Sequence, residues 1–265
     1  MYTRLQLAKK FIQYYFSASN GRGHGIHSPF VFDFVTNVLN DTREFYPYES
    51  IESVRRQLLI DNTLIEMEDF GAGSVQQFKK QRSIGSIARH AAKSKKLSQL
   101  LFRIVHYYQP KIILELGTSL GISSAYMAAA NPGARVISIE GASSVATLAR
   151  HHHKFLQIQN VEVRTGQFDD ILPVTLQELL RVDLAFIDGN HRLEPTVQYF
   201  EQLLSKTTPQ SILIFDDIHW SKEMEESWRI IKKHQAIAAS IDLFFIGIIL
   251  FRPEFKSKQE FTIRF

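Results

Sequence analysis

Cysteine is absent from this chain of 265 residues, and that absence removes several classes of protein. Without thiols there is no disulfide framework, no zinc ribbon, no thiolate nucleophile and no iron–sulfur cluster. Glycine and proline are sparse, with 13 and 8 residues, which excludes collagen-like and low-complexity chains. With 45% hydrophobic and 22% charged residues, the composition predicts a globular protein of one large domain, or of one domain plus an extension.

The chain also lacks a block of one charge and a long hydrophobic run. Its 31 Lys and Arg residues exceed its 27 Asp and Glu residues by only four, and the surplus is spread along the sequence, which is weak support for a nucleic-acid partner. The most apolar stretch, Leu243 to Phe251, has about half of the ~20 residues that a membrane-spanning helix needs. Met1 to Phe16 lacks the continuous apolar region of a signal peptide. We therefore expect a cytoplasmic protein without a membrane association.

Five strand-then-helix units follow one another from Pro110 onward. Their strands are predicted at Ile112–Leu116, Arg135–Glu140, Val161–Thr165, Val182–Ile187 and Ile212–Phe215. Such a series predicts an α/β fold with parallel strands and with helices on both faces of the sheet. Ile241–Phe251 and Glu260–Phe265 follow without a helix between them, which predicts a closing antiparallel hairpin. The sequence thus predicts a mostly parallel sheet of seven strands.

The first 95 residues do not continue this alternation. Leu5–Tyr15 and Ile51–Leu59 have the spacing of helices. We therefore divide the chain into an α-rich N-terminal extension, residues 1–95, and a main domain, residues 96–265. The extension is expected to form a pocket wall or a lid over a binding site, or to contact a second copy of the chain in a homodimer.

The strongest functional signal is the turn after the first predicted strand, because ligands of parallel sheets bind at the carboxyl ends of the strands. Gly117 and Gly121 allow the backbone to approach a ligand, and the helix that follows presents its N-terminus to an anion. Glu140 ends the second strand 23 residues after Gly117, close to the ~20-residue spacing of a carboxylate that binds ribose hydroxyls. These features predict a cofactor that contains a nucleoside.

The glycine pattern separates two classes of nucleotide cofactor. A dinucleotide-binding turn has the pattern G-x-G-x-x-G, and here Ser119 stands in place of the second glycine. The string from Ile113 to Ser124 instead resembles motif I of class I S-adenosylmethionine methyltransferases, and specifically the catechol and caffeoyl-coenzyme A O-methyltransferase branch. Residues 95–265 carry this resemblance, and residues 20–95 are similar to the N-terminal extension of a bacterial branch of that superfamily. The resemblance implies a Rossmann-like class I methyltransferase fold.

The same resemblance implies cofactor-binding roles for residues at the ends of the first strands. Glu115 and Ser123 would hold the amino and carboxylate ends of the methionine part of S-adenosylmethionine, and Glu140 would bind its ribose. Gln167 and Phe168, after the third strand, would contact adenine, with Gln167 in place of the more common Asp. The other residues that the resemblance places around the cofactor are Gly117, Thr118, Ser119, Gly121 and Asp188.

Acidic residues end the fourth and fifth predicted strands, where the resemblance places the acceptor. In metal-dependent relatives three oxygen ligands stand at the positions of Asp188, Asp216 and Asp217, the last usually being Asn. Three carboxylates would suit Mg²⁺ or another divalent cation, which lowers the pKa of an acceptor hydroxyl. His191 replaces the lysine base of the family, so Asp188 and His191 are the candidate catalytic residues and could deprotonate the acceptor without a metal. The same acids could instead only cap the helices that follow.

Three further segments have competing interpretations. His219 and Trp220, after the fifth strand, are candidates for the acceptor pocket, although Trp220 could equally pack in the core. Residues 69–74 resemble a nucleotide-binding turn, but the polar sequence after them favours a loop. His151–His153 resemble a metal-binding tract, but successive helical side chains point about 100° apart, which favours a solvated helix face.

The sequence therefore predicts an S-adenosylmethionine-dependent methyltransferase that O-methylates a small hydroxylated acceptor. Three alternatives stay open at this point. They are an inactive protein that binds the cofactor or a partner, an oxidoreductase that binds NAD, and a nucleic-acid methyltransferase. Asp188-Gly189-Asn190-His191 stands where methyltransferases of flipped amino bases carry an Asn-Pro-Pro-Tyr type of motif, which argues against the last.

Overall fold

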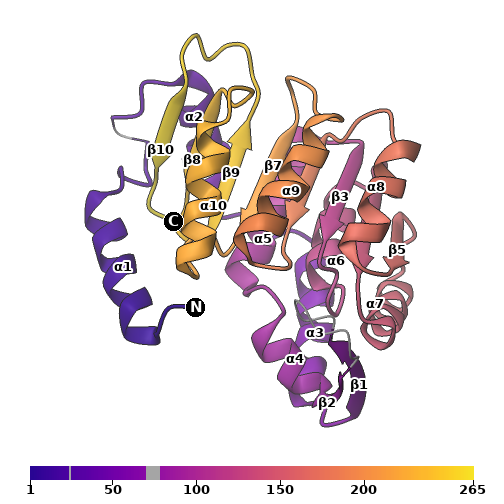
Figure 1. The fold of residues 1–265 in the computed structure, drawn as a ribbon. Coiled ribbons are helices and arrows are strands. Elements are labelled where there is room, and N and C mark those ends of the chain that lie inside the picture. Colours follow the sequence, from indigo (N-terminus) through magenta and orange to yellow (C-terminus); the bar gives the residue numbers. More distant parts are fainter. Residues whose placement is uncertain (24, 70–77) are drawn as a thin grey trace. The chain divides into compact units, whose positions relative to one another are not determined.

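The computed structural model describes residues 1–23, 25–69 and 78–265, and the chain forms two compact units (Figure 1). One unit joins residues 1–41 to residues 176–265, and the other comprises residues 42–175. The first 95 residues are therefore divided between the two units, whereas the sequence suggested a boundary at residue 95. Among the described residues, no helix is both long enough and apolar enough to cross a bilayer.

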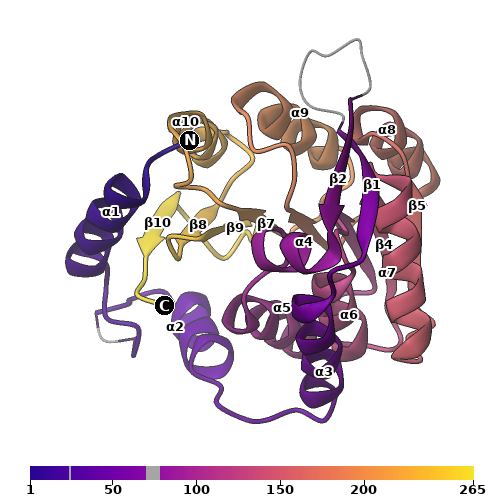
Figure 2. The same cartoon turned by 90° about the horizontal axis from the view of Figure 1, so that it is seen from below.

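Residues 42–175 contain a parallel sheet that is covered by helices. The strands β3 (Ile112–Leu116), β4 (Arg135–Glu140) and β5 (Val161–Thr165) pair side by side in that order. The helices of this unit are α3 (Pro47–Ile60), α4 (Ile84–His90), α5 (Lys95–Tyr108), α6 (Ile122–Ala130) and α7 (Ser143–Phe155). Helices α5 and α6 pack against each other, and α3 packs on α6 (Figure 2). The last helix, α8 (Phe168–Glu178), runs from this unit into the other.

An antiparallel hairpin that the sequence did not indicate also belongs to this unit. Strand β1 (Leu64–Asp69) pairs with β2 (Phe78–Ser83), with Leu64 opposite Ser83. β1 lies beside α7, where the Ser144 hydroxyl donates a hydrogen bond to the Glu66 carbonyl. The first 95 residues thus contain this hairpin as well as helices.

The other unit is built on strands β6 (Leu184–Ile187), β7 (Ile212–Asp216), β8 (Ala239–Asp242), β9 (Ile246–Leu250) and β10 (Gln259–Thr262), which pair in the order β10-β8-β9-β7-β6. Its helices are α1 (Arg4–Ser17), α2 (Pro29–Phe34), the π-helix η1 (Val35–Leu39), α9 (Leu193–Leu204) and α10 (Lys222–Lys233). Helix α1 lies at the β10 edge of these strands (Figures 1 and 2). A bridge between Ser19 and Ile263 continues this contact beyond α1.

The predicted α/β class is confirmed, and the differences lie in the last strands. The mostly parallel sheet has eight strands among the described residues, in place of the seven predicted. The expected strand Ile241–Phe251 is divided into β8 and β9, which form the antiparallel hairpin, and β10 pairs parallel to β8. The Asp242 side chain accepts a hydrogen bond from the Phe244 backbone nitrogen at 2.8 Å and closes the turn inside an apolar run.

Helix α10 shows why the sequence predicts most helices well. Ser221 caps its N-terminus by accepting a hydrogen bond from the Met224 nitrogen. Lysines occupy its last turn, where their positive charges interact favourably with the negative end of the helix dipole. Trp228 is buried on the inner face. Its ring fills the space beside Gly247 of β9, where a Cβ atom would come within 2.5 Å of the indole.

A buried ion pair fixes α3 to the helices of the unit of residues 42–175. Glu52 and Arg55 are 7% and 8% exposed, and the Arg55 Nε atom lies 2.9 Å from Glu52 Oε1. The Tyr126 hydroxyl of α6 donates to the same Glu52 oxygen at 2.8 Å. Arg55 also donates to the Ser98 hydroxyl of α5 at 3.0 Å. One charged pair therefore joins three helices.

We expect Arg55→Ala to lower the free energy of unfolding by about 3–5 kcal/mol, because it leaves the Glu52 carboxylate buried without its cation. Urea unfolding measures the loss. Arg56→Ala is the matched control, since the ion pair of Arg56 with Glu49 is exposed and its loss should change stability by about 0.5 kcal/mol or less. Equal losses in the two variants would contradict the role given to the buried pair.

Candidate functional site

The turn between β3 and α6 has a backbone that only a few residue types adopt readily. The angle φ is 100° at Gly117 and 80° at Gly121, where glycine carries no steric cost. It is also positive, 47°, at Ser119, and such strain in a non-glycine residue is concentrated at functional sites. The backbone nitrogens of Gly117 and Thr118 donate to the Ile139 carbonyl at 2.9 and 3.2 Å and hold the turn against β4.

Glu115, in the last part of β3, is a fully buried carboxylic acid. Its Oε2 atom accepts a hydrogen bond from Ser138, whose hydroxyl also contacts Thr118. Its Oε1 atom has no hydrogen-bond partner among the described residues. Burial raises the pKa of Glu115 to about 7, although hydrogen bonds from Ser123 and Ser138 act in the opposite direction. A buried acid with an unused oxygen fits a ligand that brings a positive charge.

Glu140, at the end of β4, is held by the backbone of both adjoining turns. Its Oε2 atom accepts a hydrogen bond from the Ser119 nitrogen at 2.8 Å, and its Oε1 atom accepts one from the Ala142 nitrogen at 3.0 Å. Burial raises the pKa of Glu140, and these backbone donors lower it in part. Each oxygen keeps a further lone pair, so the oriented carboxylate can accept hydrogen bonds from two neighbouring hydroxyls.

Gln167 and Phe168 follow β5 at the same edge of the sheet. The register pairs Glu140 with Thr165, and the Gly166 nitrogen donates to the Glu140 carbonyl at 2.9 Å. Phe168 is the first residue of α8, and the Gln167 carbonyl accepts from the Ile171 nitrogen in its first turn. The structure therefore brings the residues after β3, β4 and β5 to one edge, as the parallel order predicts.

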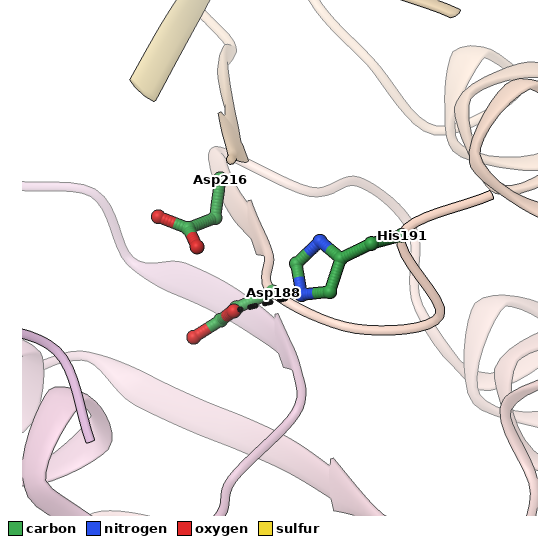
Figure 3. Close-up of side chains that lie close together, drawn as sticks. All are labelled: Asp188, His191 and Asp216. Atoms are coloured by element: carbon green, nitrogen blue, oxygen red, sulfur yellow. Dashed lines mark ion pairs between the residues drawn. The ribbon is translucent and has the colours of Figure 1, made fainter. Parts of the chain in front are cut away.

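A second group of side chains lies at the ends of β6 and β7 (Figure 3). The register pairs Ile187 with Phe215, so Asp188 and Asp216 are neighbours at the carboxyl ends of the two strands. His191 turns back toward them, and its Nε2 atom lies 3.6 Å from Asp188 Oδ1. One ligand atom from each of the three side chains lies within 4.8 Å of the others. Asp216 is only 1% exposed.

Asp217 lies beside this group and is not part of it. Its Oδ2 atom is 4.0 Å from His191 Nε2, and its backbone is left-handed, with φ of 54°. The sequence suggested three carboxylates, whereas the structure brings together two carboxylates and an imidazole. Such a mixed donor set fits Mn²⁺, Fe²⁺ or Zn²⁺ better than Mg²⁺, which prefers oxygen ligands.

Sequence reasoning missed a second charged cluster in the same unit. His219 lies between two carboxylates, with Nδ1 at 3.0 Å from Glu225 Oε1 and Nε2 at 2.9 Å from Asp242 Oδ2. Burial lowers the pKa of His219, but hydrogen bonds and charges of the two acids raise it overall. Glu225 also accepts hydrogen bonds from Tyr2 and Lys10 of the N-terminal segment, at 2.7 and 2.9 Å. These partners are far apart in the sequence, so no local pattern could reveal them.

The expectation of a solvated histidine face on α7 is wrong. His152 and His153 are buried, because they pack against the back of the turn after β3. His152 Nδ1 lies 2.9 Å from the Leu120 carbonyl, and His153 Nε2 lies 3.1 Å from the Gly121 carbonyl. Burial lowers the pKa of His153 to about 4, so this side chain is neutral. The predicted loop at residues 69–74 lies almost wholly outside the described residues.

Known proteins resemble the chain mainly around these strand ends. Residues 114–218 match a family model described as a methyltransferase domain. Over 126 residues the chain is 33% identical to a catechol O-methyltransferase of Niastella koreensis, which covers 46% of this chain and 55% of that protein. Over 114 residues it is 30% identical to the O-methyltransferase imqG of Aspergillus flavus, covering 41% and 45%. The chain thus spans about half the length of the curated relatives it matches.

Solved structures extend the likeness to most of the chain. The O-methyltransferase TomG of Streptomyces achromogenes, in complex with S-adenosylmethionine, matches with a TM-score of 0.57 and 19% identity over 82% of this chain and 95% of its own. The Podospora anserina methyltransferase PaMTH1 matches with a TM-score of 0.60 and 12% identity over 95% and 98%. The predicted methyltransferase fold is therefore confirmed. Residues 114–218 are thus similar to methyltransferase domains, and the chain has the fold of these methyltransferase structures.

Proposed function

We propose that this protein is an S-adenosylmethionine-dependent O-methyltransferase of a small hydroxylated acceptor. The observation that carries the proposal is the presence of two carboxylates at adjacent strand ends, Glu115 being buried and Glu140 partly buried. Glu115 has an oxygen without a hydrogen-bond partner among the described residues, and Glu140 is oriented by two backbone donors. The first fits the ammonium group of the cofactor, and the second fits its ribose diol. The bound cofactor supplies a methyl group activated on a sulfonium.

The other cofactor residues complete this arrangement in the proposal. Ser123, near the start of α6, holds the carboxylate of the methionine part together with the N-terminus of that helix. Gln167 and Phe168 contact adenine from the end of β5. The turn beside the cofactor consists of Gly117, Thr118, Ser119 and Gly121. Asp188, at the end of β6, is the remaining residue assigned to cofactor binding.

The group of Asp188, His191 and Asp216 serves the acceptor in the proposal. His191, supported by Asp188, would accept the proton of the acceptor hydroxyl as the acceptor oxygen takes the methyl group and S-adenosylhomocysteine leaves. The same three residues would hold a divalent cation, with Asp217 as a further oxygen donor. Such an ion would supply Lewis-acid stabilisation of the acceptor oxygen.

The proposal includes a cytoplasmic location, a small-molecule acceptor, and no role for nucleic acid or a membrane. The weak charge surplus and its even distribution support the absence of a nucleic-acid partner. In the proposal, residues 96–265 bind the cofactor, and residues 1–95 contribute to acceptor binding or to a homodimer contact. Two helices of that first region make specific polar contacts with residues outside it: α1 with Glu225 and α3 with Tyr126.

Calorimetry with S-adenosylhomocysteine, followed by transfer of a radiolabelled methyl group to catechol, tests the proposed function. Micromolar binding together with methyl transfer supports it. Binding without transfer to any of a panel of catechols and phenols would identify a cofactor-binding protein without activity. Binding of NAD in place of S-adenosylhomocysteine would overturn the proposal in favour of an oxidoreductase.

The raised pKa of Glu115 predicts that cofactor binding releases a proton. With a pKa of about 7, this carboxyl is mostly protonated in the free protein near pH 6, and a ligand ammonium beside it favours the carboxylate. Release of close to one proton is therefore expected at about pH 6 and little at about pH 8, so affinity should rise with pH up to about 7. Calorimetry in buffers of different ionisation enthalpy measures the proton number. Glu115→Gln should abolish the release, and an unchanged proton number in that variant would contradict the assignment.

A further inference from the structure

An apolar cavity of about 290 Å³ lies within the unit of residues 1–41 and 176–265. Its volume is close to the lower end of the ~300–1,000 Å³ that is usual for small-molecule sites. Helix α1, the loop after β7 and the turn between β8 and β9 supply its walls. The side chains that matter for the argument are Leu7, Phe11, Asp217, Trp220, Phe244 and Phe245.

The α1 wall is held in place by specific contacts. The Phe11 ring meets the Phe244 ring edge-on, with centroids 5.1 Å apart, and it lies 5.9 Å from the Phe245 ring. Lys10, the residue before Phe11 in α1, forms an ion pair with Glu225 at 2.9 Å. The Tyr2 backbone nitrogen also donates to the Trp220 carbonyl at 3.1 Å. These contacts hold α1 in place, so the N-terminal helix forms one wall of the cavity.

The charges around the cavity favour a neutral ligand. The nearby cationic side chain of Lys10 is paired with Glu225, and His219 is bonded to both Glu225 and Asp242. Asp217 is one of the lining residues, and its carboxylate would repel an anion and could accept a hydrogen bond from a hydroxyl. The same carboxylate lies 4.0 Å from His191 and connects the cavity to the group of Asp188, His191 and Asp216.

We propose that this cavity binds the apolar body of the methyl acceptor, and that α1 selects uncharged hydroxylated acceptors over anionic ones. The inference rests on the proposed function, because it identifies the occupant as the acceptor. Leu7 and Phe11 are then specificity-determining residues contributed by the N-terminal extension. The aromatic side chains of the cavity give affinity through apolar contact with the acceptor, and Asp217 orients the acceptor hydroxyl.

A charge introduced into the α1 wall tests the proposal. The probes are a fluorescent dihydroxynaphthalene and its sulfonated analogue, titrated into the full-length protein with S-adenosylhomocysteine present. The natural protein should bind the neutral probe at least about tenfold more tightly. Leu7→Lys should shift the ratio of the two affinities toward the sulfonate by about tenfold, since the new ammonium would face the cavity. Leu5→Lys is the matched control on the same helix, because Leu5 is 84% exposed and is not among the lining residues.

The outcomes separate this inference from the proposed function. A shift in Leu7→Lys but not in Leu5→Lys, with the same S-adenosylhomocysteine affinity in both, supports the assignment of the cavity. Equal ratios in all three proteins, or tighter binding of the sulfonate by the natural protein, would overturn it while leaving cofactor binding intact. Failure of S-adenosylhomocysteine to bind in any of them would instead refute the proposed function.

Discussion

Replacing Glu140 with alanine is expected to weaken the binding of S-adenosylhomocysteine by about 100-fold or more. A hydrogen bond to a charged group contributes about 1.5–3 kcal/mol, and the oriented carboxylate is placed to accept two of them from a ribose diol. The loss also removes the acceptor of the Ser119 nitrogen, so the turn before α6 is less well ordered for its ligand. Calorimetric titration measures the change directly.

Glu162→Ala is the control for that experiment. Glu162 lies on the neighbouring strand β5, is partly exposed and pairs with Arg135 at the surface, so its loss should change the affinity by less than about twofold. Glu140→Gln should fall between the two, because the amide keeps one acceptor oxygen and turns the other into a donor. Affinity of Glu140→Ala within about threefold of the natural protein would show that this residue does not bind the ribose.

Much of the candidate cofactor site could be predicted because its signals are local. Gly117, Gly121 and Glu140 follow buried strands, and the parallel order of those strands brings their ends to one edge. Periodicity alone predicted β3 to β7 with few errors in their bounds. The left-handed backbone of Ser119 could not be predicted, since the Glu140 carboxylate that its nitrogen contacts lies 21 residues further along the chain.

Other features depend on contacts between distant parts of the chain, and no local pattern contains them. The Tyr2 and Lys10 contacts with Glu225 join segments more than 200 residues apart. The burial of His153 depends on the packing of α7 against the turn at Gly121. The division of the last apolar run into β8 and β9 depends on the side chain of Asp242, which closes a turn without glycine or proline.

His191→Ala is expected to lower kcat by about 100-fold to 10,000-fold while leaving S-adenosylhomocysteine affinity within about twofold. Loss of a group that accepts the proton of the acceptor hydroxyl acts on the chemical step. His191 belongs to the unit of residues 1–41 and 176–265, whereas the Glu115 and Glu140 carboxylates belong to the other unit. Initial rates with catechol and a saturating cofactor measure kcat. His234→Ala, at the end of α10, is the histidine control, because its imidazole contacts Ala236 N, the Phe200 ring and Glu201 and none of the residues assigned to the acceptor.

A metal titration of the same variant assigns the role of His191. If His191 is a metal ligand, excess Mn²⁺ should restore much of the activity of His191→Ala, because Asp188 and Asp216 can still hold the ion weakly. If it accepts the proton, kcat should stay low at every metal concentration, and the dependence of kcat on pH should lose the step that its imidazole causes. A kcat within about threefold of the natural protein would exclude both roles. Asp188 and Asp216 would then be strand-end acids that cap the loops beside them, and the acceptor proton would have to leave by another group.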